Sequence, residues 1–413
     1  MTSNAGEGRG LARSLVLVLG IAVLLGLAGA LVGMRAFAAQ APPEELSNDE
    51  LLSRVARATG DPPAFSASIT VEQSMLPAQL LEASGQEGGP PALSGPLSAR
   101  VWYGGPTQLR AELQGENGDR IFVRNGSRAW IYDGAENTVR TGEGVPEQET
   151  PNEEPVTPME VNTPMEVNRL LDELVPTSEL SQQEPVEVAG RQAYVLVLSP
   201  RDEGATLVDR AQMLVDSETY LPLRFAVYAD ERPDPVFSYQ VSGLDVGPVP
   251  ADLFNFQTPP GAEVLPLEQG AEPREQERPE GAEPTQVETV AEAQRLVDFR
   301  IRELPDPPGD RELTDVYLKN GDGVVLTYGS GWGTVVFAQG QGDGDAAMPP
   351  EAGDAEANGL QQLQTADLGG GVEAQKISTP IGSGLSWSAD GVGYVLAGSV
   401  PASELEQAAR GLR

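Results

Sequence analysis

The sequence has no cysteine and no histidine among its 413 residues. Without these residue types the chain can form no disulfide, no cysteine nucleophile, no histidine-containing catalytic triad and hardly any tight zinc site. Carboxylates, hydroxyls and arginines are left for chemistry, and no motif gathers them into one site. We therefore expect no enzyme activity, no catalytic residue, no metal site and no cofactor.

Basic residues are scarce. Only 27 Lys and Arg stand against 62 Asp and Glu, which gives a net charge of −35 at pH 7. A field of this sign repels phosphate backbones and anionic lipid head groups, so we expect no nucleic-acid partner. The acidity is typical of a protein that stays soluble in a salty or external medium.

One long apolar run occurs, from Leu15 to Val32, and Arg9 and Arg13 precede it. Its length is close to what the hydrocarbon core of a bilayer requires, and basic flanks tend to stay in the cytoplasm. We predict a single-pass anchor at 15–34, a cytoplasmic segment at 1–14 and a linker at 35–45. The alternative is a secreted chain whose signal peptide is removed near Ala38. Both interpretations place the bulk of the chain outside the cytoplasm.

Alternating apolar residues dominate the stretch 211–260 and predict three consecutive antiparallel strands with one apolar face. Turn-forming residues at 216–219 and 230–235 separate these strands. The apolar sets are Ala211, Met213 and Val215, then Leu223, Phe225 and Val227, then Phe237, Tyr239 and Val241.

The same stretch contains several short motifs. They are Val215-Asp216, Thr219, Leu221-Pro222-Leu223-Arg224, Pro250, Leu253-Phe254, Phe256 and Pro259-Pro260-Gly261-Ala262. Together they resemble the closing third of LolA/LolB/RseB-like envelope proteins, and the resemblance extends over 46–263. It implies a curved antiparallel half-barrel with a helical lid around an apolar ligand or a lipoprotein.

Local signals outside this stretch fit such a domain. A capping box of Ser47 and Glu50 predicts a helix over 46–59. Short strands follow between 65 and 140, with a hairpin turn at Asn125-Gly126. An apolar period then predicts a helix over 165–180, at the position where the family has its lid.

The resemblance implies a ligand cavity lined by aromatic and aliphatic residues of the strands and the lid. The candidates are Trp102, Phe122, Trp130, Tyr132, Met165, Leu170, Leu171, Tyr194, Leu196, Met213, Phe225, Val227, Phe237 and Tyr239. Ordinary packing within the sheet, or of a helix on the sheet, explains the same residues equally well.

A second domain follows an acidic, Pro-rich linker at 264–284. Residues 285–413 predict a small α+β domain that begins with a helix capped by Thr285 and Glu288 and ends with a helix over 401–412. The ending, 385–412, resembles an uncharacterised module at the C-terminus of exported bacterial regulators.

The expected fold is therefore α+β: an N-terminal transmembrane helix, a LolA-like half-barrel with its lid, and a small α+β domain. The expected function is that of an extracytoplasmic binding protein for a lipid, an acyl chain or a lipoprotein. The alternative is a RseB/MucB-like regulator that senses the state of the envelope and binds an anti-sigma factor.

Overall fold

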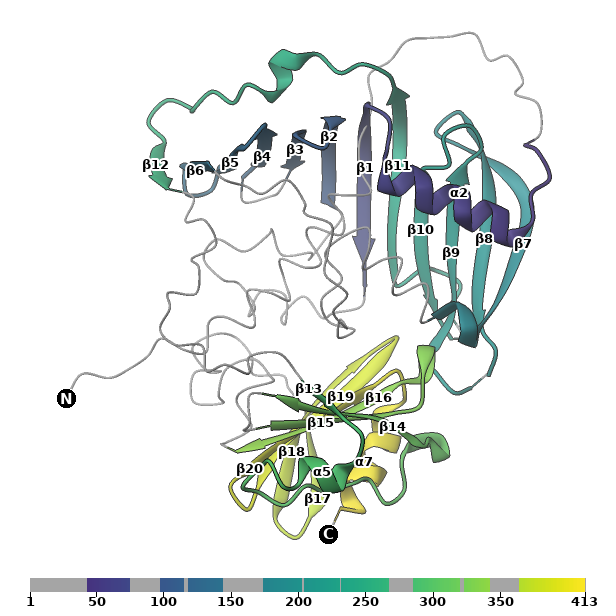
Figure 1. Ribbon diagram of the computed structural model, residues 1–413, viewed down its shortest axis with the longest axis vertical. Helices are drawn as coiled ribbons and strands as arrows, with labels where there is room; N and C mark the ends of the chain where they lie inside the picture. The colour runs from purple at the N-terminus through teal and green to yellow at the C-terminus, as the bar shows by residue number, and fades with distance from the viewer. Residues whose placement is uncertain are drawn as a thin grey trace.

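A computed structural model describes residues 43–74, 97–114, 118–143, 174–202, 204–230, 232–266, 285–319, 323–341 and 364–412. These residues form one large curved β-layer and one smaller sheet (Figure 1). The fold is mostly β, with few helices. The predicted anchor and most of the predicted lid lie outside the described residues. Within them, no helix has the length and hydropathy needed to span a membrane.

Helix α2 (Asn48–Gly60) confirms the predicted N-terminal helix and its capping box. The Glu50 amide donates to Ser47 Oγ at 3.3 Å, and the Ser47 amide donates to Glu50 Oε2 at 3.1 Å. Leu51 and Val55 are buried on the side that faces the sheet. The helix thus begins where local chemistry satisfies its free amides, and burial of these apolar side chains holds it on the sheet.

Half of the curved layer has the strand order β1-β11-β10-β9-β8-β7. Its strands are β1 (Phe65–Gln73), β7 (Ser178–Val188), β8 (Arg191–Pro200), β9 (Val208–Asp216), β10 (Pro222–Ala229) and β11 (Phe237–Val246). The predicted three-stranded meander is confirmed as β9, β10 and β11. The predicted helix over 165–180 is wrong at its end, where Ser178–Leu180 open β7 after a short 3-10 helix, η1 (Val175–Thr177).

The other half has the order β12-β6-β5-β4-β3-β2, and β2 lies beside β1 (Figure 1). Its strands are β2 (Leu97–Gly105), β3 (Gln108–Gln114), β4 (Arg120–Asn125), β5 (Arg128–Asp133), β6 (Thr138–Glu143) and β12 (Glu263–Pro266). The hairpin predicted at Asn125-Gly126 joins β4 to β5, and Gly126 has the positive φ of 62° that such a turn needs. Strand β12 pairs with β6 in parallel.

A segment that we call the strap, residues 247–262, connects β11 to β12 and contains the 3-10 helix η2 (Ala251–Phe254). Phe254 is fully buried, and its ring lies where a side chain at Gly104 would be, 2.9 Å from an ideal Cβ. A guanidinium N–H of Arg110 donates to the Leu253 carbonyl at 3.1 Å. The strap is thus fixed to β2 and β3, which lie far from it in the sequence.

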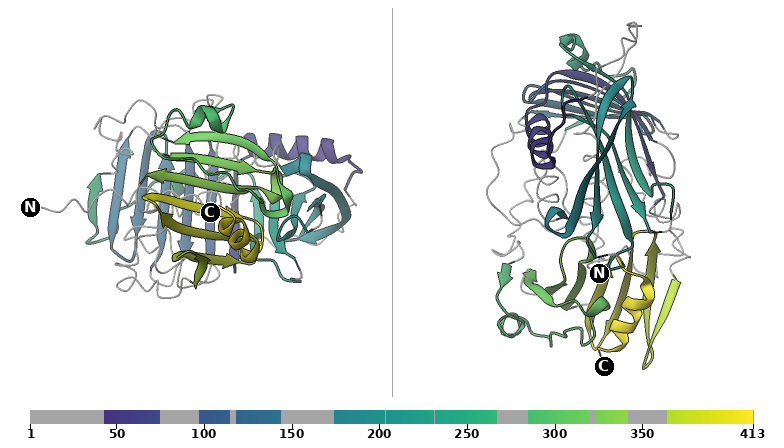
Figure 2. Two further views of the ribbon diagram at one scale, coloured as in Figure 1. Left: turned by 90° about the horizontal axis from the view of Figure 1, so that it is seen from below. Right: turned by 90° about the vertical axis from the view of Figure 1, so that its right-hand side faces the viewer.

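The smaller sheet has the order β13-β14-β15-β16-β20-β19-β18-β17. Figure 2 shows its green and yellow strands side by side, with the yellow C-terminal helix packed on them. Its strands are β13 (Thr285–Val287), β14 (Leu313–Lys319), β15 (Gly323–Tyr328), β16 (Val335–Gln341), β17 (Gln364–Gly369), β18 (Val372–Thr379), β19 (Gly382–Ala389) and β20 (Val392–Gly398). The predicted final helix is confirmed as α7 (Ala402–Arg410), which packs on β17 to β20.

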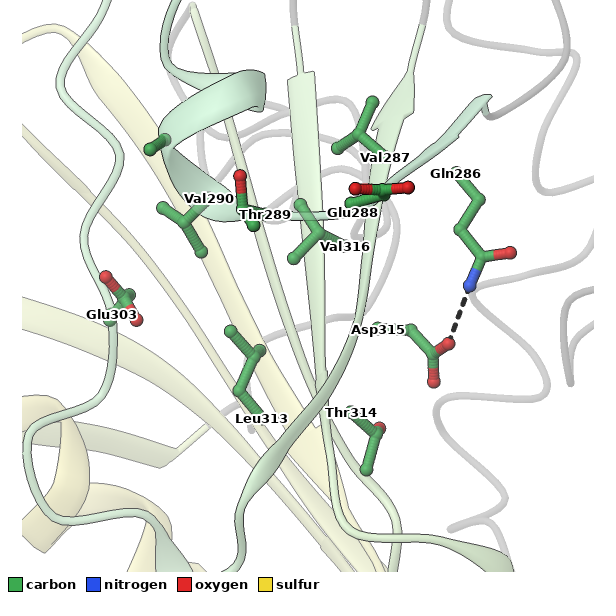
Figure 3. Close-up of a pocket in the computed structure, with 11 residues that line it drawn as sticks. Gln286, Val287, Glu288, Thr289, Val290, Glu303, Leu313, Thr314, Asp315 and Val316 are labelled. Atoms are coloured by element: carbon green, nitrogen blue, oxygen red, sulfur yellow. Dashed lines mark hydrogen bonds between the residues drawn. The ribbon is translucent and has the colours of Figure 1, made fainter.

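The helix predicted to begin at Thr285 is wrong. Thr285 lies in the edge strand β13, and the helix is the single turn α5 (Val290–Ala293), whose N-cap is Thr289. The Glu292 amide donates to Thr289 Oγ1 at 3.2 Å. A threonine followed three residues later by glutamate occurs twice in succession, at 285–288 and at 289–292, and the second pair caps the helix. A cavity lies between α5 and β14 (Figure 3).

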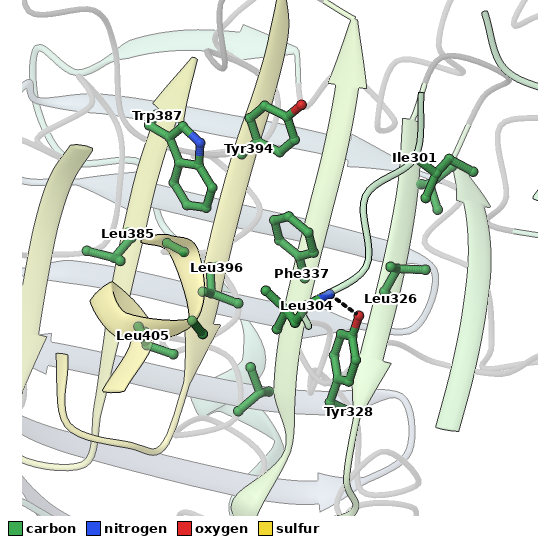
Figure 4. Close-up of a cluster of buried hydrophobic side chains, with 14 of the residues drawn as sticks. Ile301, Leu304, Leu326, Tyr328, Phe337, Leu385, Trp387, Tyr394, Leu396 and Leu405 are labelled. Carbon is green, nitrogen blue, oxygen red and sulfur yellow. Dashed lines mark hydrogen bonds between the residues drawn. The ribbon is translucent and has the colours of Figure 1, made fainter. Parts of the chain in front are cut away.

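An aromatic stack forms the centre of the second core (Figure 4). Trp387 and Tyr394 lie 5.3 Å apart between ring centroids, and Phe337 lies 6.0 Å from Tyr394. The buried Gln339 side chain accepts from the Arg302 amide at 2.8 Å and donates to the Arg302 carbonyl at 2.7 Å. This amide therefore fixes the irregular segment before β14 to the sheet.

The two sheets are joined by hydrogen bonds between the 200–207 region and the second domain. The Leu207 amide donates to the Ser399 carbonyl at 2.9 Å. The hydroxyls of Thr206 and Ser399 lie 2.7 Å apart. The Arg311 guanidinium also donates to the carbonyl of Ala205.

Candidate ligand-binding face

The face of the curved layer that carries α2 is defined by register, because directly paired residues of antiparallel strands project to the same side. Leu196 pairs with Met213, Met213 with Phe225, and Phe225 with Tyr239. We call this side the α2 face. It contains the apolar sets predicted for β9, β10 and β11, except that Leu223 lies at a register irregularity; Leu223 and Val241 pack in another cluster.

Three of the predicted cavity residues, Tyr194, Leu196 and Met213, are buried against Leu51 and Val55 of α2. The Tyr194 hydroxyl also donates to the Glu44 carbonyl at 2.9 Å. These three side chains therefore form the core between helix and sheet, in agreement with the plain packing interpretation.

Four further predicted residues, Phe225, Val227, Phe237 and Tyr239, lie together on β10 and β11 and are only half-buried. We call them the aromatic patch. The Phe225 ring lies 6.5 Å from Phe237 and 6.3 Å from Tyr239, between centroids. On the opposite side of the same strands, Ala226 and Ser238 are buried. Phe237 and Tyr239 pack against the core cluster of β1, β2 and β3, and Phe225 packs against the α2 core, so the patch is a half-buried apolar area between two cores.

Tyr239 brings the one polar atom of the patch. Burial raises the pKa of its phenol above the ordinary tyrosine value. Within the part of the chain that the structure describes, its hydroxyl has no hydrogen-bond partner. A polar group left unpaired in an apolar setting costs about 1–3 kcal/mol, so a ligand that offers a donor or acceptor here would gain affinity.

The predicted cavity cannot include all of its aromatic residues, because the sheet divides them between its two faces. Trp130 pairs with Val123, which pairs with Arg110, which pairs with Trp102. Tyr132 follows Trp130 by two residues and projects to the same side. Phe122 projects to the other side, where it packs with the cluster of β1 and β2.

The strap contacts the face of Trp102, Trp130 and Tyr132 at Trp130. Trp130 stacks on Phe256 of the strap, with centroids 6.2 Å apart. The Tyr132 hydroxyl donates to Asn137 Oδ1 at 3.2 Å. Trp102, Trp130 and Tyr132 therefore lie on the side of the sheet opposite to Phe122, and Trp130 packs on the strap, which comes from a distant part of the sequence.

The lid residues Met165, Leu170 and Leu171 lie outside the described residues. Their predicted role as a cover for the ligand remains a prediction.

A buried ion pair at the end of β9 was not predicted. Asp216 is fully buried, and its carboxylate accepts from Arg191 Nε at 2.7 Å and from the Thr219 hydroxyl at 2.6 Å. The Asp216 hydrogen bond raises the pKa of Arg191. The motif residues Asp216 and Thr219 thus hold the turn between β9 and β10, a structural role. Within the described residues, no three metal-binding side chains gather closely enough to hold a metal ion.

Comparison with known proteins gives structural neighbours only. No family model and no curated protein matches the sequence. The crystal structure of MucB in complex with MucA(peri) is 18% identical, with a TM-score of 0.38, over 89% of this chain and 98% of that one. The Pseudomonas aeruginosa MucA/MucB complex is 19% identical, with a TM-score of 0.40, over 88% and 97%. A LolA superfamily protein from Nitrosomonas europaea is 8% identical, with a TM-score of 0.20, over 51% and 99%. The neighbours thus belong to the groups that the sequence resembles.

Proposed function

We propose that the chain is a non-enzymatic binding protein that acts outside the cytoplasm and holds a lipid, an acyl chain or a lipoprotein against the aromatic patch. The observation that supports this most is the half-buried state of Phe225, Val227, Phe237 and Tyr239 beside a helix-covered core. Apolar side chains that stay partly open on an otherwise packed face are typical of a site for an apolar ligand. In this proposal the N-terminal apolar segment anchors the chain in the membrane.

A photoactivatable fatty acid added to membranes that contain the full chain tests this proposal. Mass spectrometry of the labelled protein should place the adduct on β10 and β11. Phe237→Ser should reduce labelling at least fivefold, because a polar side chain in the patch weakens apolar contact by about 1–2 kcal/mol. The matched control is Ile131→Ser, since Ile131 is an exposed apolar residue of β5 outside the patch. Labelling that ignores Phe237 and spreads over the surface would exclude the patch as the site.

A second function, regulation through a protein partner, is supported by the second domain. The second domain has a hydrophobic core of its own and is hydrogen-bonded to the first domain. The proposed acyl-chain site uses only the first domain, so the second domain is free to serve another role, such as binding a protein. MucB has been crystallised with MucA(peri). We propose as the alternative that this chain binds an anti-sigma factor or a similar membrane regulator.

Purification of the full chain from cross-linked membranes tests the alternative. Recovery of a membrane regulator whose capture depends on the second domain would support it. Efficient recovery of the chain with no regulator of sigma-factor activity would count against it, whatever the result of the fatty-acid experiment.

A further inference from the structure

The cavity beside β13 has a volume of about 440 Å³ and lies between the start of α5, Glu303 and the outer side of β14 (Figure 3). Its apolar lining comes from Val287, Val290, Leu313 and Val316. It is on the second domain, far in the fold from the aromatic patch, and no part of the proposed lipid site uses it.

The cavity adjoins an incomplete edge of the sheet. Strand β13 ends at Val287, which pairs with Val316 of β14. Strand β14 begins three residues earlier, at Leu313, and within the described residues no strand pairs with 313–315 on this side. An edge of this kind offers backbone donors and acceptors to an extended segment.

The charge around the cavity has one sign. Glu288, Glu303 and Asp315 line it, and no lysine or arginine does. Among the described residues none of these three carboxylates forms an ion pair. Asp315 accepts one hydrogen bond, from Gln286 Nε2 at 2.8 Å. The site therefore complements a cationic group whose stem is apolar.

We propose that this cavity binds an extended segment of a partner protein that carries arginine or lysine. The segment adds to β14 along 313–315, and its basic side chain enters the cavity. The guanidinium or ammonium group lies beside Glu288 and Asp315, while its methylene stem packs on Leu313 and Val290. This inference concerns a separate site and does not depend on the proposed lipid site.

A labelled peptide with the sequence Val-Arg-Val-Arg-Val, blocked at both ends, tests the proposal by fluorescence anisotropy with the full chain. A second peptide with citrulline in place of arginine keeps the shape and removes the charge. We expect the arginine peptide to bind and to weaken as salt is added, and the citrulline peptide to bind at least tenfold more weakly. The double variant Glu288→Gln, Asp315→Asn should weaken the arginine peptide about tenfold, because each exposed pair contributes roughly threefold.

The chain is acidic throughout, so the control must carry the same change of charge. Glu187→Gln with Glu373→Gln neutralises two exposed carboxylates on β7 and β18 and should leave the affinity unchanged. Because the chain has no cysteine, Thr314→Cys gives a single site for a fluorophore that should respond to the arginine peptide. Equal weakening by both double variants, equal binding of both peptides, or a response at position 314 to calcium alone but not to the peptide would each overturn the proposal.

Discussion

The indole of Trp332 donates a hydrogen bond to Ser178 Oγ at 2.6 Å, and Ser178 Oγ in turn donates to the Leu174 carbonyl at 2.7 Å. Trp332 belongs to the 3-10 helix η4 (Gly331–Gly333) of the second domain, and Ser178 opens β7 of the first. Thr177 lies against Gly331, where no Cβ would fit. One buried hydroxyl therefore connects the second domain to the chain just before β7.

We expect Trp332→Phe to lower the free energy of unfolding by about 1 kcal/mol, the usual net value of one hydrogen bond. Ser178→Ala should lower it further, because it also removes the bond to Leu174. A double-mutant cycle in urea measures the coupling of the two side chains, which should be about 0.5–1.5 kcal/mol. Additive effects would show that the two domains do not communicate through this bond.

Arg191 pairs with two carboxylates, the buried Asp216 and the exposed Glu218. We expect the loss of unfolding free energy to be much larger when Asp216 is neutralised than when Glu218 is. Asp216→Asn should destabilise the protein by about 2–4 kcal/mol, because it leaves the half-buried guanidinium with only the exposed carboxylate of Glu218 as a charge partner. Glu218→Gln should cost less than about 1 kcal/mol, since Glu218 is 60% exposed. Chemical denaturation of both variants checks this, and similar losses for the two would contradict it.

Local signals in the sequence predicted α2, α7 and the β9–β11 meander correctly, because each depends on residues close in the chain. The capping box of Ser47 needs only Glu50, and the alternation at Met213, Phe225 and Tyr239 needs only a period of two. The helix predicted at Thr285 was wrong for the same reason, since it too was based on neighbouring residues alone. The two successive capping patterns, at 285–288 and 289–292, have the same residues at their ends, and the pairing of β13 with β14 decides which one caps a helix.

The candidate site could be predicted only in part, since alternation shows that residues share a face but not what covers that face. Trp102 and Trp130 have the same pattern as Phe225 and Tyr239. Trp130, however, stacks on Phe256 of the strap, which lies 126 residues later in the chain. The ion pair of Asp216 could not be predicted from neighbouring residues either, because Arg191 lies 25 residues away in the sequence.

The close contact between Gly104 and Phe254 allows a test of how firmly the strap is held on β2. A Cβ at this position would lie 2.9 Å from both the Phe254 ring and Gln108 Oε1, so we expect Gly104→Ala to cost about 1–3 kcal/mol through overpacking. The control is Gly60→Ala, at the end of α2, where no atom lies within 4 Å of the added carbon. Proteolysis should cleave the strap of the Gly104 variant faster. Equal protection in both variants would show that the strap tolerates displacement of Phe254.

The buried phenol of Tyr239 should make the stability of the protein depend on pH in the alkaline range. Burial raises the pKa of the folded phenol above its unfolded value of about 10, so the folded state retains this proton longer. Its contribution to stability is complete below pH 10 and is lost as the pH rises further, because the unfolded state then gains by ionising. Tyr239→Phe should therefore reduce the loss of unfolding free energy between pH 8 and pH 11, and should be neutral or slightly stabilising at pH 7. Tyr132→Phe, which removes a hydroxyl bonded to Asn137, should instead destabilise at pH 7. An unchanged loss of stability at pH 11 in the Tyr239 variant would show that this phenol already has a partner or is solvated.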